Sequence, residues 1–405
     1  FDIHHRFLKG NYESFIVSKE LNQEFDSSYS YNCIVRNWFE RKYNRLKGIL
    51  NKFYTKETIT ENKYDFLDFQ EDRNQRKFKD MLKKVPFNPD VIIIYALQGF
   101  INAQTIFEIQ KSTGAKIYWL LYDMFAMTGG CHYSWNCSGF ENDCRNCPAI
   151  VRKDKKDIPF YNLNFKKKYL SEIQVNIFPV SSWLIEKTKK SALFKNQSII
   201  EWMLPQDIEI FKPEVKKMIK AELKLDPEKK YILFGAVNLH SERKGFKYLS
   251  DALAKIKLMN LVREEYEIII IGKNDQVIEL ETRFKINVFE MVHDKKLFAR
   301  YYQAAHMVVI PSVQDAGPLM MAEAISCGVP VVCFDMGFAR DFIKEGKTGY
   351  IAKLYDSSDL AKGIAHILTL SEADHNTYSK NCRDMAENKL NFETQFNKLV
   401  DILSK

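Results

Sequence analysis

Two carboxylates eight residues apart are the side chains of this sequence best suited to chemistry. Asp315 lies in a predicted turn, and Glu323 lies on a predicted helix among Met and Ala neighbours, where a carboxylate is rarely buried without a partner. In one interpretation Asp315 caps the helix and Glu323 is a solvated surface residue. In the other, both acids accept hydrogen bonds from sugar hydroxyls while the helix start holds a phosphate. The second interpretation predicts a nucleotide-sugar site.

The elements that must position these acids form a strand, a turn, a helix and a second strand. Continuous apolar runs at Met307–Pro311 and Val329–Phe334 are typical of strands buried on both faces of a parallel sheet. Pro318 suits the first turn of the helix between them, because its missing amide hydrogen costs nothing there, and Gly328 suits its end. The turn is therefore expected at the carboxyl edge of the sheet, beside the free amides of the helix start.

The two acids, followed by Cys-Gly-Val-Pro-Val-Val at 327–332, resemble the motif of the large retaining glycosyltransferase family with the GT-B fold, family four. The resemblance implies that Asp315 contacts the transferred sugar and that Glu323 contacts the ribose of the nucleotide. It also implies donor binding at Gly317, Pro318 and Leu319. This chain has Asp where the family usually has Glu, and Gly-Pro where it usually has Phe-Gly, so the identity of the sugar is not predicted.

Two adjacent cations follow another predicted strand, Tyr231–Val237. Arg243 and Lys244 could neutralise a diphosphate leaving group; the alternative is a solvated charge run. The family has Lys-Gly here, which matches Lys244 and the next residue, with an Arg about five residues earlier. That earlier position is Leu239, and we expect Arg243 to take its place. Lys273, just after the next predicted strand, is a further candidate for donor binding.

The first half of the chain contributes one acid after a predicted strand. Lys116–Leu121 reads as a buried strand, and Asp123 follows at its carboxyl edge. The resemblance implies that this Asp lies near the reacting sugar and that a His precedes it; here that residue is Tyr122. Tyrosine is a poor base near neutral pH because its pKa is about 10. Enzymes of this class are thought to need no strong base, so Asp123 remains a candidate catalytic residue.

Four cysteines lie within seventeen positions and close with a Cys-x-x-Cys pair. They suit one tetrahedral zinc ion, with disulfides, an iron-sulfur cluster and unliganded thiols as alternatives. The spacing differs from that of nucleic-acid zinc fingers, and the nearby Glu141 and Asp143 argue against a nucleic-acid partner. His132 is a fifth candidate ligand. The predicted ligands are Cys131, Cys137, Cys144 and Cys147.

The segment from Asp123 to Pro148 resembles a subgroup of bacterial family-four enzymes that build surface polysaccharides. In that subgroup the loop lies on the amino-terminal domain near the cleft. A metal there would rigidify a loop that faces the acceptor, or it would only staple a long insertion.

The bulk composition limits the partners. The 405 residues carry a formal charge of +8, a mild excess that suits phosphate-bearing ligands or an anionic membrane surface but does not by itself indicate nucleic acid. No apolar run is long enough to cross a bilayer, and eight cysteines without a secretory signal predict a reducing compartment. Asn37–Lys56 has aromatic and basic residues at helical spacing, which predicts either an interfacial membrane helix or an ordinary surface helix. We expect a cytoplasmic protein that contacts the inner face of the plasma membrane through 37–56.

Strand-helix alternation predicts an α/β fold, and the resemblance implies two doubly wound, Rossmann-like domains facing a cleft, as in GT-B enzymes. We expect an acceptor-side domain at 1–205, with its first strand upstream of the sequence, and a nucleotide-sugar domain at 206–390. The closing helix, 391–405, is expected to cross back to the first domain.

The predicted reaction transfers a hexosyl group from a nucleotide sugar to a glycan or a lipid-linked acceptor, with retention at the anomeric carbon and no catalytic metal. The alternative is a non-catalytic subunit of the same fold that binds nucleotide or acts as a scaffold. Three departures from the family favour this alternative: Tyr122 for His, Asp315 for Glu and Asp207 for Gly.

Overall fold

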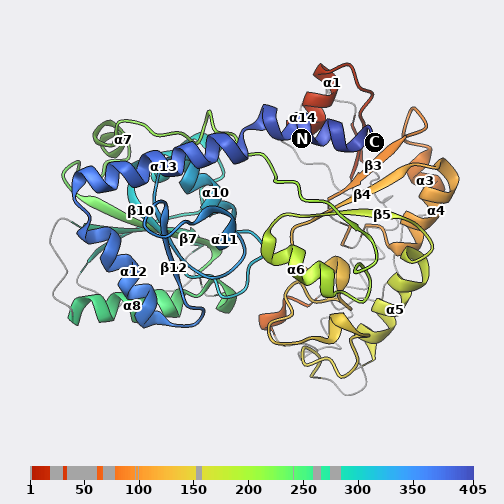
Figure 1. The fold of residues 1–405 in the computed structure, drawn as a ribbon, viewed down its shortest axis with the longest axis horizontal. Helices are drawn as coiled ribbons and strands as arrows, with labels where there is room; N and C mark the ends of the chain where they lie inside the picture. The colour runs from red at the N-terminus through yellow and green to blue at the C-terminus, as the bar shows by residue number, and fades with distance from the viewer. Residues whose placement is uncertain are drawn as a thin grey trace, which may run out of the picture. The chain divides into compact units, whose positions relative to one another are not determined.

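The computed structural model describes residues 2–18, 31–33, 62–66, 78–95, 97–98, 100–151, 157–239, 241–258, 266–273 and 284–405. It divides into two compact units, Phe1–Pro179 with Glu186–Glu201, and Val180–Ile185 with Trp202–Lys405. Each unit contains a sheet of parallel strands with helices around it (Figure 1), which confirms the predicted α/β class with two Rossmann-like domains. The stretch Asn37–Lys56, predicted as an amphipathic helix, lies outside the described residues.

The first unit is built on a four-stranded sheet in the order β3-β4-β5-β6, with every pair parallel. All residues of the central strand β4 (Lys116–Leu121) are buried after the first, as its apolar run predicts. Helix α4 (Ala103–Thr113) begins where Asn102 accepts the Thr105 amide at 2.8 Å. The helix α3 (Phe78–Leu82) and α5 (Ile158–Leu170) both pack against α4.

The remaining elements of the first unit are short, apart from α1 and α6. The last strand is only two residues long and pairs with β5 at Asn176 and Ile177. In order, these elements are α1 (Asp2–Lys9), β1 (Ile16–Ser18), β2 (Tyr31–Cys33), the 3-10 turns η1 (Asn62–Tyr64), η2 (Phe125–Met127) and η3 (Gly139–Glu141), β3 (Val91–Ile94), β5 (Val175–Pro179), α6 (Ser182–Lys190), which begins in the other unit, and β6 (Ser198–Ile199).

The second unit contains a six-stranded parallel sheet in the order β12-β11-β10-β7-β8-β9. Helices α8 and α12 pack together on one face of this sheet, and α10 and α13 pack together on the other (Figure 1). The elements are α7 (Lys216–Glu222), β7 (Lys230–Asn238), the 3-10 turn η5 (Glu242–Lys244), α8 (Phe246–Leu258), β8 (Tyr266–Lys273), β9 (Lys285–Phe289), α9 (Lys295–Ala304), β10 (Ala305–Ile310), α10 (Leu319–Ser326), β11 (Val331–Phe334), α11 (Ala339–Phe342), β12 (Gly349–Ala352), α12 (Ser357–Thr369), α13 (Glu372–Leu390) and α14 (Phe392–Leu403).

The predicted strand-turn-helix-strand unit is confirmed in this sheet. β10 and β11 are adjacent parallel strands, and α10 connects them. Pro318 occupies the cap position just before the helix, and Gly328 follows its end in the left-handed conformation, with φ of 68°. The helix therefore begins and ends where the sequence predicts.

The closing helix of the chain is α14 (Phe392–Leu403), which lies within the predicted segment 391–405. The indole of Trp202 donates to the Gln395 carbonyl of this helix at 2.9 Å, which ties it to the start of the second unit. Its return to the first domain remains a prediction.

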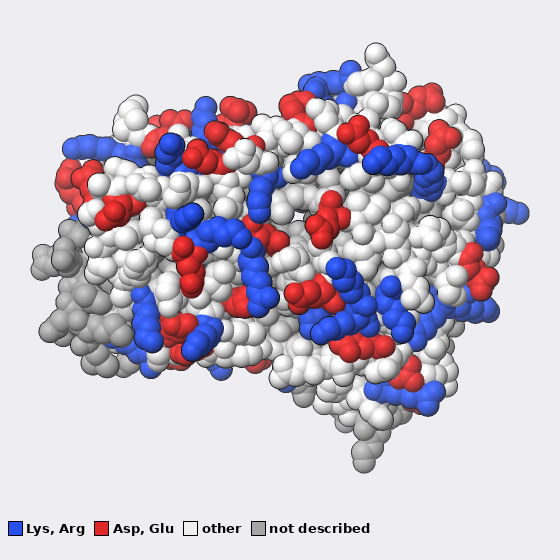
Figure 2. Space-filling view, in the orientation of Figure 1, with Lys and Arg blue, Asp and Glu red and all other residues white. Residues whose placement is uncertain are grey.

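Two further findings concern the surface and the membrane. Lys and Arg side chains are interspersed with Asp and Glu over the face shown in Figure 2, so the modest net charge is not gathered there into one basic patch. Within the described ranges, no helix is long and apolar enough to cross a membrane.

Candidate active site

The second sheet has a point where the strand order reverses, between β10 and β7. These strands are adjacent and parallel, and the chain leaves each in the opposite direction across the sheet. In open α/β sheets, ligands bind at the carboxyl edge beside such a switch point. The turn that ends at Gly245 and the turn before α10 border this point, and they carry the predicted cations and the first predicted acid.

The structure brings Arg243, Lys244 and Asp315 together. The Lys244 Nζ lies 2.6 Å from the Asp315 Oδ2, and the Arg243 Nη1 lies 3.5 Å from the same oxygen. Asp315 is 5% exposed, whereas both cations keep about a fifth of their side-chain surface exposed, at 23% and 22%. The two predicted cations are therefore not a solvated charge run. They share one carboxylate at the carboxyl edge of the sheet.

Backbone contacts hold the two turns together. The Val313 amide donates to the Arg243 carbonyl at 2.8 Å. Gly245 has φ of 71°, and a Cβ at this position would collide with the Pro311 carbonyl oxygen. A glycine is thus required here both by conformation and by the close approach of the neighbouring turn.

Asp315 is not the helix cap that the first interpretation required. Its Oδ1 accepts the Gly317 amide at 3.2 Å, which fixes the turn, and α10 begins after Pro318 without a side-chain cap. Leu319, the first residue of the helix, is 52% exposed. The first turn of α10 therefore opens at the same edge as the cations.

Glu323 is a partly buried acid with a partner. The hydroxyl of Tyr302, on α9, donates to the Glu323 Oε2 at 2.6 Å. Burial raises the pKa of Glu323 to about 7, and the Tyr302 hydrogen bond partly opposes this rise. The solvated interpretation of Glu323 is wrong, because the residue is partly buried and its carboxylate accepts the Tyr302 hydroxyl.

Tyr302 was not predicted as a site residue. It lies on the buried side of α9 with no exposed surface, and its pKa is raised well above the ordinary value by burial and by Glu323. The apolar periodicity of that helix marks the residue as core, and nothing in the sequence connects it to Glu323. The last predicted donor residue, Lys273, ends β8 at the same edge of the sheet, but its side chain lies outside the described part.

In the first unit, Asp123 lies at the carboxyl edge of β4 and has two partners. Its Oδ2 lies 2.6 Å from the His132 Nδ1, and its Oδ1 accepts the Phe125 amide at 2.8 Å. The His132 ring stacks on the Phe125 ring, with centroids 5.2 Å apart. From the sequence, His132 was only a candidate for a fifth metal ligand; in the structure its imidazole contacts the Asp123 carboxylate.

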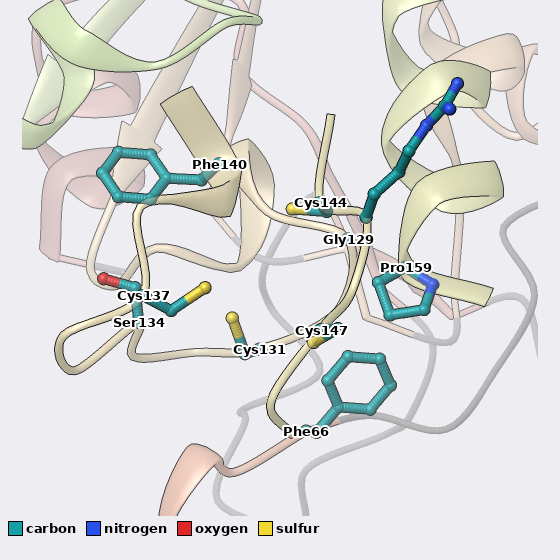
Figure 3. A pocket seen from close by; sticks show the side chains of 10 residues that line it. Phe66, Gly129, Cys131, Ser134, Cys137, Phe140, Cys144, Cys147 and Pro159 are labelled. Atoms are coloured by element: carbon teal, nitrogen blue, oxygen red, sulfur yellow. The ribbon is translucent and has the colours of Figure 1, made fainter. Parts of the chain in front are cut away.

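The four cysteines of the loop line one cavity of about 10 Å³, which is room for one small ion or water. Figure 3 shows their side chains around this space, with Phe66, Phe140 and Pro159 at its wall. His132 does not line it. All four are free thiols, so the disulfide alternative is absent from the described cysteines.

The chemistry of the cysteine cavity suits thiolates. Amides of Gly129 and Gly139 donate to the sulfurs of Cys144 and Cys137, and the amides at 149 and 150 donate to Cys147. Burial nevertheless raises the pKa of Cys144 to about 12, so these thiols need a cation to ionise. In this conformation, no group of three Cys, His, Asp or Glu side chains among the described residues is close enough together to hold one metal ion. The donor set fits zinc, and the sulfurs would have to close around it.

Side chains of α5 fix the cysteine loop. The Lys166 Nζ, only 1% exposed as a residue, donates to the carbonyls of Phe125 and Thr128 at 2.8 and 2.9 Å. Asn162 donates to the Gly129 carbonyl at 2.9 Å. Neither residue was predicted. A lysine within a mixed helix gives no sequence signal that it is buried.

Comparison with known proteins supports this view of the second unit. The model of the family described as "Glycosyl transferases group 1" matches residues 215–388, which contain the switch point and its charged residues. An uncharacterized glycosyltransferase of Methanocaldococcus jannaschii is 28% identical over 163 residues, 38% of this chain and 40% of that protein. The Escherichia coli UDP-Gal:alpha-D-GlcNAc-diphosphoundecaprenol alpha-1,3-galactosyltransferase is 22% identical over 204 residues, 48% of this chain and 51% of its own. The matches thus span about half or less of these curated relatives.

The fold is shared over nearly the whole chain. The solved structure of sucrose-phosphate synthase from Thermosynechococcus elongatus matches with a TM-score of 0.66 and 14% identity, over 99% of this chain and 90% of that one. At this identity the likeness concerns the fold alone, which is that of GT-B glycosyltransferases.

Proposed function

We propose that the protein is a retaining glycosyltransferase that moves a hexosyl group from a nucleotide sugar to a glycan or lipid-linked acceptor, in surface polysaccharide synthesis. The observation that carries this proposal is the cluster of Arg243, Lys244 and Asp315 at the switch point, within the segment that matches the glycosyl transferase family.

Each residue at the switch point has a part in this proposal. Arg243 and Lys244, with the amides from Gly317 to Leu319, stabilise the negative charge that develops on the departing diphosphate. Asp315 orients the transferred sugar. When a diphosphate binds, it competes with Asp315 for the two cations, and this exchange frees the carboxylate for sugar hydroxyls.

Glu323 accepts hydrogen bonds from the ribose, and Tyr302 holds its carboxylate in place. Lys273 adds positive charge at the end of β8. No catalytic metal is part of this scheme, since the protein cations supply the charge.

The test is nucleotide release from a panel of UDP-, GDP- and ADP-sugars in the presence of sugar acceptors. The wild type should turn over one donor, and Glu323→Ala and Lys244→Ala should each reduce turnover by about 10²-fold or more. Lys247→Ala, which removes an exposed cation at the second position of α8, should change little. The anomeric configuration of the product, read by NMR, tests retention.

Two outcomes contradict this function. Inversion at the anomeric carbon would exclude the retaining mechanism. Binding of one nucleotide without turnover of any donor would favour the non-catalytic subunit that Tyr122 and Asp315 suggest.

For the cysteine cavity we propose a structural zinc ion held by Cys131, Cys137, Cys144 and Cys147. The purified protein should contain about one zinc per chain, and Cys144→Ser and Cys147→Ser should lose it and lower the melting temperature. Cys333→Ser, a buried thiol on β11, should keep the metal. Metal-free protein with the same stability would contradict the proposal.

The proposed setting is the cytoplasmic face of the plasma membrane, reached through the basic stretch 37–56. Co-sedimentation with anionic vesicles, lost when the basic residues of that stretch are replaced, tests this contact. Binding that is unchanged in the replaced protein would contradict it.

A further inference from the structure

Aromatic side chains follow two neighbouring strands of the first sheet. Tyr95 comes directly after β3, and Tyr122 comes directly after β4; the two strands are parallel, with Ile94 opposite Trp119. Both tyrosines are exposed, at 41% and 39%. Burial of the phenol hydroxyl raises the pKa of Tyr122, although the residue as a whole is exposed, and the nearby Tyr95 adds to this rise. The carboxyl edge of the first sheet therefore presents a pair of exposed aromatic rings.

The same edge holds an imidazole whose orientation is fixed. Both carboxylate oxygens of Asp123 are engaged, one by the Phe125 amide and the other by the His132 Nδ1. A proton on Nδ1 is the one that suits a carboxylate partner, and it leaves Nε2 as a hydrogen-bond acceptor. Stacking on Phe125 and the bond from the Met124 amide to the His132 carbonyl, at 3.0 Å, fix the ring and its backbone.

The Nε2 atom is available to a ligand. The His132 side chain is 21% exposed, and within the described chain its one hydrogen-bonding partner is Asp123. The cysteine cavity next to it is lined by other residues, so the imidazole is not directed to that space. It stands at the sheet edge where open α/β folds bind their ligands.

We propose that Tyr95, Tyr122 and the His132–Asp123 pair bind the sugar unit of the acceptor. The C–H face of a pyranose packs on the tyrosine rings, and the hydroxyl that is to be glycosylated donates a hydrogen bond to the His132 Nε2. Asp123 acts as a positioning residue through His132. This inference deepens the proposed function and rests on it, because it assigns the acceptor to residues of the first unit.

The proposed site suits a sugar because it combines apolar aromatic rings with one polar hydrogen-bonding atom. Aromatic faces suit the C–H groups of a sugar ring, and a single oriented acceptor selects one hydroxyl. A free glycan and a lipid-linked sugar present the same chemistry to this site. They differ in the lipid portion, which these residues do not recognise.

The experiment measures transfer kinetics with the donor found active and with two acceptors, a free oligosaccharide and a lipid-linked sugar diphosphate. His132→Ala and Tyr95→Ala should each lower kcat/KM for the acceptor by about 10-fold, and the double variant by more. The dissociation constant for the free nucleotide diphosphate should not change. Both acceptors should show the same loss, and their relative rates identify the source of the sugar.

Matched controls separate a site from a general effect. Tyr161→Ala removes a 62% exposed tyrosine of α5, and His366→Gln replaces a histidine of α12; both should leave acceptor kinetics unchanged. Unchanged acceptor kinetics in His132→Ala and Tyr95→Ala would overturn the inference. Weakened nucleotide binding in these variants would show that the residues bind the donor. Loss of bound zinc in His132→Ala would show that His132 is a metal ligand. Either result would overturn the inference.

The inference can also be tested if no donor is turned over. Saturation-transfer NMR with the methyl glycosides of glucose, galactose, mannose and N-acetylglucosamine reports sugar binding without catalysis. A signal that is present in the wild type and lost in His132→Ala would support the site while the proposed transferase function fails. The absence of any signal in the wild type would contradict the site itself.

Discussion

The turn after β10 and the loop after β4 both carry charged side chains at the carboxyl edge of a parallel sheet, but they are held in different ways. The first is short and is fixed by contacts within the two adjoining turns: the Val313 bond to the Arg243 carbonyl, the close approach at Gly245 and the Asp315 contact with the Gly317 amide. The second is long and is fixed by side chains from elsewhere, chiefly Lys166 and Asn162. A short turn takes its position from the sheet, whereas a long loop needs buried contacts of its own.

The largest expected effect concerns the close backbone approach at Gly245. Gly245→Ala should lower the free energy of unfolding by about 3 kcal/mol or more, because it adds a collision with the Pro311 carbonyl to the cost of a left-handed alanine. Donor turnover should fall by about 100-fold as the two cations shift. Urea melts and nucleotide release measure both.

Gly346→Ala is the matched control for that substitution. Gly346 has the same φ of 71°, but no atom lies within 4 Å of the added Cβ. This variant should lose only about 1–2 kcal/mol. Equal losses in both variants would mean that the close approach at Gly245 is unimportant.

The next largest effect concerns the side-chain contacts that hold the loop after β4. Lys166→Met keeps an unbranched apolar side chain but removes the ammonium that donates to the Phe125 and Thr128 carbonyls, at a cost of about 2–4 kcal/mol. Amide exchange should accelerate in the cysteine loop first. Lys168→Met, at an exposed position of the same helix, should change stability by less than about 0.5 kcal/mol. A loop that stays protected in Lys166→Met would show that the cysteines hold it alone.

Acid should act on the second unit through two stacked imidazoles. The ring centroids of His306 on β10 and His375 on α13 lie 3.8 Å apart. Burial lowers the pKa values of these imidazoles to about 2 and about 4, and Lys216 and Lys230 add to the effect. Because the folded pKa values are depressed, stability is complete above the ordinary value near 6.5 and is lost as the pH falls below it.

The loss should approach about 1.4 kcal/mol per pH unit for each imidazole. Urea melts between pH 7.5 and 5 measure it, and His375→Gln should reduce the slope. An unchanged slope in this variant would show that other groups control the acid response.

The smallest effect concerns the buried acid of the donor side. Because burial raises the pKa of Glu323 to about 7, its contribution to stability is complete below the ordinary pKa of 4.5 and is lost as the pH rises through 7. Glu323→Gln should therefore be more stable than the wild type by about 1 kcal/mol at pH 8, and this gain should disappear at pH 5. A constant difference across this range would indicate that the effect is not one of ionisation.

Much of the fold could be predicted from the sequence because buried parallel strands are continuous apolar runs, as at β4, β8 and β10. The limits of α10 and α14 follow from Pro, Gly and Asn at their ends. The extent of β6 could not be predicted, because an apolar run does not show how many of its residues pair with the neighbouring strand; only two of the five residues of β5 pair with β6.

The charged residues of the switch point were predictable because they belong to local motifs. Arg243, Lys244 and Asp315 were each found separately, and only the adjacency of β7 and β10 joins them. Tyr302, Lys166 and the His132–Asp123 contact were missed, because each acts across a distance in sequence that a local pattern does not record.

The pairing of β7 with β10 also has a consequence for how the molecule forms. The residues that meet at the switch point are separated by about seventy positions, which include two further strands and two helices. Contacts of such long range form late in folding, since the entropy of closing the intervening chain must be offset first. A chain that is still being synthesised, and has not yet released β10, holds Arg243 and Lys244 as two ordinary surface cations. The charged cluster therefore needs β10 to be paired with β7.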